Sequence, residues 1–406
     1  MAEAALTIEK IEVARKRLDG VAYHTPLDYS TSFSEMSGSA VYLKLENMQK
    51  TGSFKIRGAY NKVMSLGDKE RSRGVIAASA GNHAQGVAYA AARAGLPCTI
   101  VMPSGAPISK IMATQGYGAR VVLAEGGYDE AYTRAVELQE KSGATFVHSF
   151  NDPDVIAGQG TIAMELLDDI QDLGAVIIPV GGGGLIAGVS YALKHFKPGI
   201  RVIGVQAGGA PAMYLSLKEQ KLVECESTCT FADGIAIRKP GALTFSIIRD
   251  CVDEIVTVDD EEIAGAILML LERSKIVAEG AGAAGLAALL YRKTHLAGVK
   301  TVVLLSGGNI DVNILSIIIE RGLAKTGRYV RIRALVTDQP GNLSRLLALA
   351  AAARANVISV SHDRIRPTIP LKQAEVELVL ETRNREHIDE IMSLLTRNNY
   401  TPVIIS

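Results

Sequence analysis

One lysine of this chain lies in a context suited to chemistry, within the stretch KLENMQKTGSFKIRGAY, residues 44 to 60. Lys55 has Phe54 on one side and Ile56 on the other, and a Gly-Ala pair follows at Gly58. An amine in apolar surroundings loses part of its preference for the charged form, and a neutral amine can attack a carbonyl group to form a Schiff base. The alternative is an exposed lysine whose methylene groups cover apolar surface.

Four consecutive glycines follow the apolar stretch AVIIPV: Gly181, Gly182, Gly183 and Gly184. A helix is expected to begin near Leu185, and backbone N–H groups at a helix N-terminus bind anions, most often phosphate. A flexible tight turn is the plainer alternative. The permissive dinucleotide fingerprint Gly182-x-Gly184-x-x-Ala187 is also present, but the next strand ends in Gln206 where that fingerprint expects an acidic residue. The run therefore favours a small phosphorylated cofactor.

The stretch SAGNHAQG, residues 79 to 86, is predicted to connect a strand to a helix. Its small residues Ala80 and Gly81 let a ligand approach the backbone at a helix N-terminus, where a carboxylate is favoured, and Asn82 and His83 add directed polar groups. Ser79 has an equally good reading as a helix cap, and His83 as a structural hydrogen bonder.

The stretch VVLLSGGN ends a buried strand at Ser306. Ligand sites collect at the carboxyl ends of parallel strands, so Ser306 is read either as a ligand donor or as a turn residue. A candidate amine nucleophile, an anion cradle and a turn for a small ligand are together what pyridoxal 5′-phosphate requires.

The elements that must position these residues alternate between short β-branched runs and helical patterns. RGVIAAS, PCTIVMP, ARVVLAEGG and TFVHSF are expected strands before the glycine run, and RVIGVQA, EIVTV and KTVVLLSGG follow it. That alternation predicts parallel sheets covered by helices. From about residue 326 the rhythm changes to βαββαβ, the ferredoxin-like order. We therefore expect a catalytic domain at 1–325, with a smaller lobe at roughly 45–150, and a second domain at 326–406.

Composition narrows the classes of partner. The 43 basic and 43 acidic side chains balance, so nothing draws the 406-residue chain to nucleic acid or to an anionic membrane. The charged N-terminal stretch MAEAALTIEKIEVARKRLDG indicates an amphipathic helix and lacks the apolar core of a signal peptide. The four cysteines are few and scattered, which favours a reducing compartment, and Cys225 and Cys229 lack the second ligand pair of a zinc site. We expect a cytoplasmic protein without a membrane span.

Six motifs, KLENMQKTGSFKIRGA, SAGNHAQG, FNDPDVIAGQGT, PVGGGGLIAG, TFADGIAIRKPG and LLSGGN, occur in this order. Over residues 5–325 the chain resembles the threonine ammonia-lyases (threonine dehydratases), which belong to the tryptophan-synthase-β-like pyridoxal-phosphate enzymes of fold type II. Residues 326–406, with DQPGNL at the first turn, resemble an ACT domain, a regulatory module that often binds amino acids. The resemblance implies a two-lobed α/β fold with open parallel sheets, followed by a ferredoxin-like domain.

The resemblance also implies roles for individual residues. Lys55 forms the Schiff base with the cofactor, and Phe54 packs beside it. Asn82 donates to the 3′ oxygen of the cofactor, and Ser306 faces the pyridine nitrogen. The residues expected to hold the cofactor phosphate are Gly181, Gly182, Gly183, Gly184 and Leu185.

The Ser79–His83 turn is similar to the family's grip on the substrate carboxylate, and it includes Ala80 and Gly81. The implied reaction is removal of the Cα proton by Lys55 and loss of the β-hydroxyl. L-threonine then gives 2-oxobutanoate and ammonia, and L-serine gives pyruvate.

Departures from relatives refine this expectation. Serine racemases of this fold place a serine where this chain has Ala80, so racemisation is disfavoured. Their divalent-cation site uses acidic residues that the stretch QAGGAPAM lacks, so no metal is expected. Glu279 is either close to the cofactor or a plain structural carboxylate. A serine-preferring dehydratase or a serine racemase remains the alternative within the fold; from other classes, a nucleotide-dependent oxidoreductase and a non-catalytic amino-acid sensor stay open.

The turn DQPGN suggests an amino-acid effector site, because the helix after it leaves backbone N–H groups unpaired. The residues expected there are Asp338, Gly341 and Asn342. A dimerisation module with an ordinary helix cap is the alternative. Pairing of such domains predicts a homodimer or homotetramer.

Overall fold

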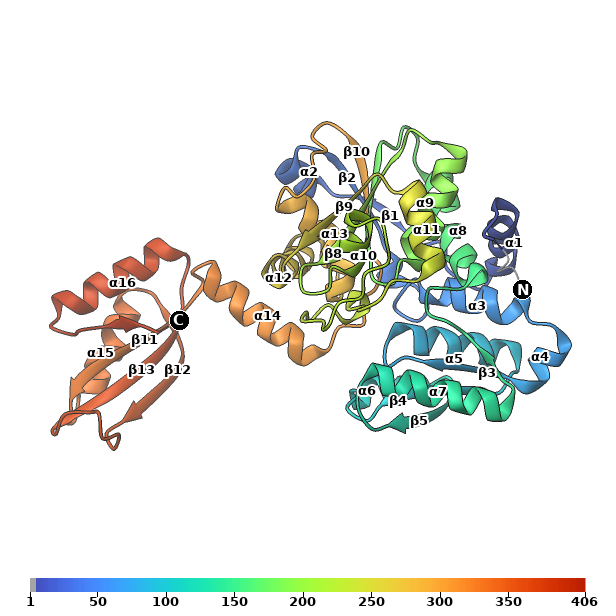
Figure 1. Ribbon diagram of the computed structural model, residues 1–406. Coiled ribbons are helices and arrows are strands. Elements are labelled where there is room, and N and C mark those ends of the chain that lie inside the picture. The colour runs from blue at the N-terminus through green and yellow to red at the C-terminus, as the bar shows by residue number, and fades with distance from the viewer. Residues whose placement is uncertain (1–4, 406) are drawn as a thin grey trace. The chain divides into compact units, whose positions relative to one another are not determined.

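The computed structural model describes residues 5–405. The chain divides into two compact units between Ile310 and Asp311. The first unit holds two lobes, each built around its own sheet, and the second is a smaller α/β unit (Figure 1).

The small lobe contains a parallel four-stranded sheet in the order β5-β4-β3-β6. Its strands are β3 (Val75–Ala78), β4 (Cys98–Pro103), β5 (Arg120–Ala124) and β6 (Thr145–Phe146). Strand β6 is shorter than the predicted run TFVHSF, because Nδ1 of His148 accepts hydrogen bonds from the backbone N–H groups of Phe150 and Asn151 and turns the chain away from the sheet. After that turn, Ser149 and Phe150 line the cavity described below.

The large lobe contains a six-stranded sheet in the order β1-β2-β10-β7-β8-β9, which is parallel except for β1. Its strands are β1 (Leu27–Tyr29), β2 (Ala40–Lys44), β7 (Ala175–Pro179), β8 (Arg201–Ala207), β9 (Glu254–Val258) and β10 (Lys300–Leu304). Strands β7 and β10 are buried at nearly every residue, as expected for parallel strands covered on both faces. The predicted parallel α/β architecture is confirmed.

Helices cover the two sheets of the first unit (Figure 1). They are α1 (Ile8–Leu18), α2 (Thr31–Ser37), α3 (Lys55–Ser65), α4 (Asp68–Arg73), α5 (Asn82–Ala94), α6 (Ile108–Gly116), α7 (Tyr128–Ser142), α8 (Pro153–Asp169), α9 (Gly184–Phe196), α10 (Ala212–Lys218), α11 (Ala242–Cys251), α12 (Asp260–Met269) and α13 (Gly280–Leu290). The predicted N-terminal helix is α1, which Thr7 caps through its side chain. Residues 1–4 of that prediction lie outside the described residues.

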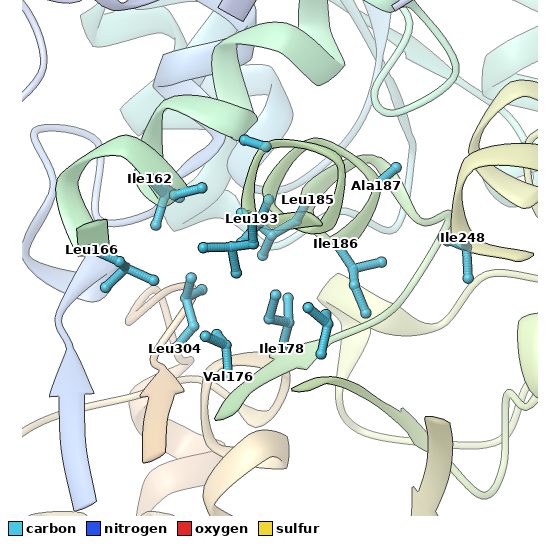
Figure 2. Packing of buried hydrophobic residues seen from close by; sticks show 14 of the residues in the cluster. Ile162, Leu166, Val176, Ile178, Leu185, Ile186, Ala187, Leu193, Ile248 and Leu304 are labelled. Atoms are coloured by element: carbon cyan, nitrogen blue, oxygen red, sulfur yellow. The ribbon is translucent and has the colours of Figure 1, made fainter. Parts of the chain in front are cut away.

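The main core lies where α8 and α9 pack on the large sheet (Figure 2). Val176 and Ile178 of β7 face Leu193 and Ile186 of α9, and Ile162 of α8 joins the same cluster. All five side chains are fully buried. Burying a side chain of this size contributes roughly 1.5–3 kcal/mol, so this contact fixes β7 and α9, the two elements that flank the glycine run.

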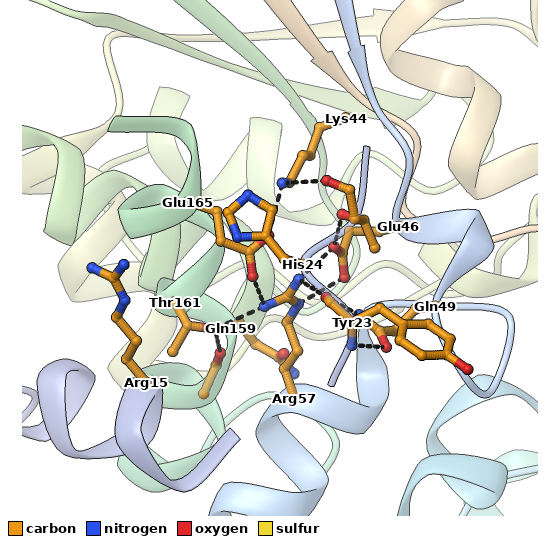
Figure 3. Close-up of polar contacts among 12 residues, drawn as sticks. Arg15, Tyr23, His24, Lys44, Glu46, Gln49, Arg57, Gln159, Thr161 and Glu165 are labelled. Carbon is orange, nitrogen blue, oxygen red and sulfur yellow. Dashed lines mark hydrogen bonds and ion pairs between the residues drawn. The ribbon is translucent and has the colours of Figure 1, made fainter. Parts of the chain in front are cut away.

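A buried network of charged groups fixes α3, the helix that begins at Lys55 (Figure 3). The Arg57 guanidinium donates to both carboxylate oxygens of Glu46, at 2.8 and 2.7 Å, and to Glu165 of α8 at 2.5 Å. Lys44, at the end of β2, contacts the other oxygen of Glu165 at 2.7 Å. Burial alone would lower the pKa of the Arg57 guanidinium, but Glu46 and Glu165 outweigh it and raise that pKa. The network joins α3 of the small lobe to β2 and α8 of the large lobe.

The second unit is a four-stranded antiparallel sheet in the order β12-β13-β11-β14, with two helices between its strands. Its elements are β11 (Tyr329–Thr337), α15 (Asn342–Ala352), β12 (Asn356–Asp363), β13 (Gln373–Glu381), α16 (Arg385–Arg397) and β14 (Val403–Ile404). The predicted βαββαβ order is confirmed. Helix α14 (Val312–Lys325) groups with this unit, and the Lys325 carbonyl accepts a hydrogen bond from Arg385. The catalytic-domain prediction had included these residues.

Within residues 5–405, each helix is too short or too polar to cross a lipid bilayer.

Candidate active site

The segment before α3 is held against the end of β10. The backbone N–H of Phe54 donates to the Ser306 carbonyl at 3.1 Å, and Ser53 forms an isolated β-bridge with Gly307. Lys55 is the first residue of α3, and its amine donates to the Ser149 carbonyl at 3.0 Å. Desolvation lowers the pKa of the Lys55 amine to about 8, although nearby Glu279 acts in the opposite direction. Lys55 is therefore not an ordinary solvated lysine.

The glycine run connects β7 to α9, which begins at Gly184. Gly183 has a φ of +95°, a left-handed conformation that favours glycine. A Cβ atom added to Gly182 would lie 2.3 Å from the ring of Phe150, so Phe150 packs directly against the loop. The Thr244 hydroxyl donates to the Gly182 carbonyl at 2.6 Å. With its carbonyl held in this way and the first N–H groups of α9 unpaired by helix geometry, the loop has the features of an anion cradle.

The predicted small-ligand turn lies between β3 and α5, with Gly81 as the residue before the helix. The Ser79 hydroxyl accepts a hydrogen bond from the Gly81 N–H at 3.2 Å. His83 is buried, and its Nε2 lies 2.8 Å from the Val147 carbonyl, so Nε2 carries the hydrogen. Burial, followed by the charge of Lys55, lowers the pKa of His83 to about 3. The His83 ring is therefore neutral and is held through Nε2.

These segments line one cavity of about 820 Å³. The predicted residues in its lining are Phe54, Lys55, Ser79, Ala80, Gly81, Asn82, His83, Gly181, Gly182, Gly183, Gly184, Leu185 and Ser306. The structure thus brings together every residue predicted to touch the cofactor or the substrate. Asp338, Gly341 and Asn342, predicted for an effector, belong to the second unit.

Other cavity residues escaped sequence reasoning. In the cavity lining, Lys110 of α6 pairs with Asp233 at 3.5 Å, and Arg238 pairs with Asp129 of α7 at 2.8 Å. Each pair joins the small lobe to a large-lobe loop more than 100 residues away in the sequence, so no local sequence pattern predicts it. The motif FNDPDVIAGQGT contains Phe150, but nothing in its spacing indicates a partner for the glycine run.

The cavity fits pyridoxal 5′-phosphate by its own chemistry. It offers an amine whose pKa is lowered to about 8 and an anion cradle at a helix N-terminus, and its volume of about 820 Å³ lies in the range of small-ligand pockets.

Residues 18–308 match the family model described as pyridoxal-phosphate dependent enzyme. The chain belongs to this family. It is a pyridoxal-phosphate-dependent enzyme, and pyridoxal 5′-phosphate is its cofactor. The chain is also 52% identical over 400 residues to the L-threonine ammonia-lyase of Thermotoga maritima, which covers 98% of this chain and 100% of that protein.

Solved structures resemble more than three quarters of this pyridoxal-phosphate-dependent enzyme. The processed form of threonine deaminase isoform 2 from Solanum lycopersicum is 39% identical, with a TM-score of 0.73 over 77% of this chain and 92% of that one. Maize serine racemase is 37% identical, with a TM-score of 0.75 over 79% of this chain and 99% of that one. The predicted fold type is confirmed.

The family also removes the oxidoreductase alternative. Gln206, at the position where a dinucleotide site needs an acidic residue, uses its side chain to donate to the Val180 carbonyl and to accept from the Tyr214 N–H. Both ends of that amide are therefore occupied by backbone groups. As for metals, no group of three or more His, Cys, Asp or Glu side chains within residues 5–405 is arranged to hold an ion.

Proposed function

We propose that this enzyme deaminates L-threonine to 2-oxobutanoate and ammonia by eliminating water, and that L-serine, converted to pyruvate, is a second substrate. The observation that carries the proposal is the Lys55 amine, whose pKa is lowered to about 8 in a cavity that also contains an anion cradle. The names of the Thermotoga and Solanum proteins support the choice of threonine.

When bound, pyridoxal 5′-phosphate supplies the aldehyde that takes the substrate amine and the ring that withdraws electrons from Cα. Lys55 would be the residue that holds that aldehyde between turnovers. When its amine is free and neutral, Lys55 would accept the Cα proton of the substrate. Partial desolvation suits both roles, because a pKa of about 8 keeps a useful fraction of the amine neutral near neutral pH.

The remaining cavity residues hold the cofactor in this proposal. Gly181–Gly184 and the Leu185 N–H would bind the phosphate, and Phe54 would pack beside the ring. Asn82 would donate to the ring's 3′ oxygen, and Ser306 would face the pyridine nitrogen. A serine hydroxyl does not stabilise a protonated pyridine nitrogen as a carboxylate does, so prompt loss of a β-substituent is favoured over a long-lived carbanion.

The Ser79–His83 turn binds the substrate carboxylate at the N-terminus of α5. Ala80 has no proton to give to the second face of Cα, which separates this site from one designed for racemisation. Gly81 leaves room for the ligand, since a Cβ atom added there would have no neighbour within 4 Å.

Product analysis tests the proposed reaction. Incubation with L-threonine should release 2-oxobutanoate and ammonia in equal amounts, L-serine should give pyruvate, and recovered substrate should keep its configuration. A chelator should leave the rate unchanged, because no metal takes part in the proposal. Racemised substrate in excess of keto acid, or a rate that falls with chelator and returns with Mg²⁺, would contradict it.

We also propose that the second unit binds an amino-acid effector at the turn before α15. Gly341, with a φ of +96°, precedes the first N–H groups of that helix. The Asp338 carboxylate lies 3.7 Å from Arg364, and the Asn342 amide donates to the Thr337 carbonyl at 3.0 Å. Isoleucine and valine are the candidates if the pathway is biosynthetic. Only a different affinity in two states of the enzyme can turn such binding into regulation.

Titration of each branched-chain amino acid against turnover tests this role. The full chain should respond, whereas a chain ending at Ile310, the boundary between the units, should keep elimination and lose the response. Asp338→Ala in the full chain should weaken the response, with the exposed Asp389→Ala as its control. A response that survives truncation would transfer the effector site to the first unit. No response in either form would leave the second unit a structural role.

The cellular setting and assembly complete the proposal. Cys98, Cys225, Cys229 and Cys251 are all unpaired, which supports a reducing compartment such as the cytoplasm. Ile358 and Val360 are exposed on the edge strand β12, which supports a homodimer or homotetramer formed through this unit.

A further inference from the structure

The side-chain amide of Asn82 has a hydrogen-bond partner on each side. Its nitrogen donates to Oε1 of Glu279 at 2.7 Å, and its oxygen accepts from the Asn309 amide nitrogen at 2.7 Å. The same Asn309 nitrogen donates to the Thr51 carbonyl at 2.8 Å. Asn82 belongs to the small lobe, whereas Glu279 precedes α13 and Asn309 follows β10 in the large lobe.

A backbone carbonyl determines which way these amides point. The Thr51 carbonyl can only accept, so the Asn309 atom facing it must be the nitrogen. That nitrogen is a donor only, so the Asn82 atom beside it must be the oxygen. The Asn82 nitrogen then faces the Glu279 carboxylate, which accepts. A reversed Asn82 amide would set nitrogen against nitrogen on one side and oxygen against oxygen on the other.

The surrounding backbone leaves space for this arrangement only because it lacks side chains there. A Cβ atom on Gly52 would lie 2.3 Å from the Asn309 oxygen, and one on Gly307 would lie 2.5 Å from Oε1 of Glu279. The Glu279 backbone N–H donates to the Gly307 carbonyl at 3.0 Å, which fixes the carboxylate at its base. Asn82 and Glu279 line the cavity, and Asn309 reaches it through Asn82.

We propose that Asn309 and Glu279 are positioning residues that keep an N–H of Asn82, and not its carbonyl, directed at the 3′ oxygen of the cofactor. The amide nitrogen has two hydrogens, and Glu279 uses one of them. The second stabilises negative charge on the ring oxygen, where a carbonyl would repel it. The inference rests on the proposed contact between Asn82 and the cofactor. It assigns Asn309 a role and decides between the two readings of Glu279.

The visible absorption of the purified enzyme with bound cofactor, titrated with pH, tests the proposal. The midpoint is the pH at which half of the absorption change has occurred. If the 3′ oxygen of the cofactor loses its hydrogen bond from Asn82, this midpoint should rise by about one pH unit. Asn82→Ala, Asn309→Ala and Asn309→Asp should all produce the shift, and Asn309→Asp should produce the largest, because its carboxylate accepts from the Asn82 nitrogen and so favours the reversed amide. Asn47→Asp is the matched control, because the Asn47 amide donates to the Val277 carbonyl, whereas the Asn82 amide bonds to Glu279 and Asn309.

Variants of Glu279 separate orientation from charge. Glu279→Gln can still accept from the Asn82 nitrogen and should not shift the midpoint upward, whereas Glu279→Ala should have a higher midpoint than Glu279→Gln. Equal shifts in both variants would show that the charge matters and would overturn the role of Glu279 as an orienting group.

The outcomes also separate this inference from the proposed function. An unshifted Asn82→Ala would remove the contact between Asn82 and the cofactor, and the inference with it. A shifted Asn82→Ala with unshifted Asn309 variants would overturn the inference alone. Circular dichroism of each variant confirms that the fold is intact before its titration is compared.

Discussion

Lys55→Ala is expected to abolish covalent attachment of the cofactor and to lower ammonia release from L-threonine by roughly 10³-fold or more, with the fold retained. The variant loses two functions at once, because the same amine holds the aldehyde and accepts the Cα proton. Borohydride reduction followed by peptide mapping should mark Lys55 in the wild type and no residue in the variant. Lys55→Arg should be equally inactive, since a guanidinium stays protonated and cannot form the Schiff base.

Lys69→Ala is the matched control, because Lys69 is an exposed lysine of α4 outside the cavity. It should keep wild-type turnover and labelling. Ammonia release by Lys55→Ala at a rate close to that of the wild type would remove Lys55 from the chemistry.

The pKa of the same amine gives an independent readout. Desolvation lowers the pKa of Lys55 to about 8, so in enzyme stripped of cofactor the neutral fraction reaches one half near pH 8 and increases above it. Only the neutral amine attacks the aldehyde. The rate at which added pyridoxal 5′-phosphate reattaches, followed by its absorbance, should therefore rise through a midpoint near pH 8. A midpoint near 10, the ordinary lysine range, would mean that the amine is solvated.

Much of the fold could be predicted because its signals are local. Strand β7, the glycine run and α9 follow one another within a single stretch, so hydrophobic pattern and glycine spacing indicate all three. The βαββαβ unit was recognisable for the same reason. The length of strand β6 was overestimated. The side chain of His148 accepts hydrogen bonds from two backbone N–H groups and ends the strand, and residue propensities do not predict such a contact.

The site was predictable where one motif carries the chemistry and not where loops meet. Lys55 and the Ser79–His83 turn can each be recognised from a few consecutive residues. The contact of Phe150 with Gly182 and the pairing of Arg238 with Asp129 join segments that only the tertiary structure brings together. The family resemblance named the motif that contains Phe150, but the packing behind the glycine run had to come from the structure.

Arg57→Met is expected to destabilise the first unit by about 3–5 kcal/mol, because it leaves the buried Glu46 carboxylate without a charged partner and Glu165 with Lys44 alone. Glu46 is fully buried and Glu165 nearly so, and Arg57 donates to both. Urea unfolding followed by the cofactor's visible absorption reports on this unit. Arg15→Ala is the control: the Arg15–Asp168 pair on the neighbouring surface is about half exposed, and its loss should cost under about 1 kcal/mol.

The pH dependence of this loss identifies its cause. Burial alone would raise the pKa of Glu46, but Arg57 lowers it below the ordinary value, so in the wild type Glu46 adds stability above its unfolded pKa. That contribution disappears as the pH falls through the folded pKa. In Arg57→Met the unpaired carboxylate should have a raised pKa and take up a proton sooner. The difference in unfolding free energy between wild type and variant should therefore narrow as the pH falls from 7 toward the ordinary glutamate range near about 4.3.

A second substitution tests whether unpaired charge is what destabilises Arg57→Met. Adding Glu46→Gln to Arg57→Met should recover part of the lost stability, because the buried group is then neutral, whereas Glu46→Gln alone should destabilise the wild type. If the losses of stability simply add in the double variant, the cause would instead be lost packing around the Arg57 side chain. Arg57 lies one half-turn from Lys55 on the same helix, so turnover per folded molecule should also fall in Arg57→Met. In the double variant, turnover should recover less than stability does. Neutralising Glu46 removes the buried unpaired charge, but it does not restore the contact that holds the start of α3.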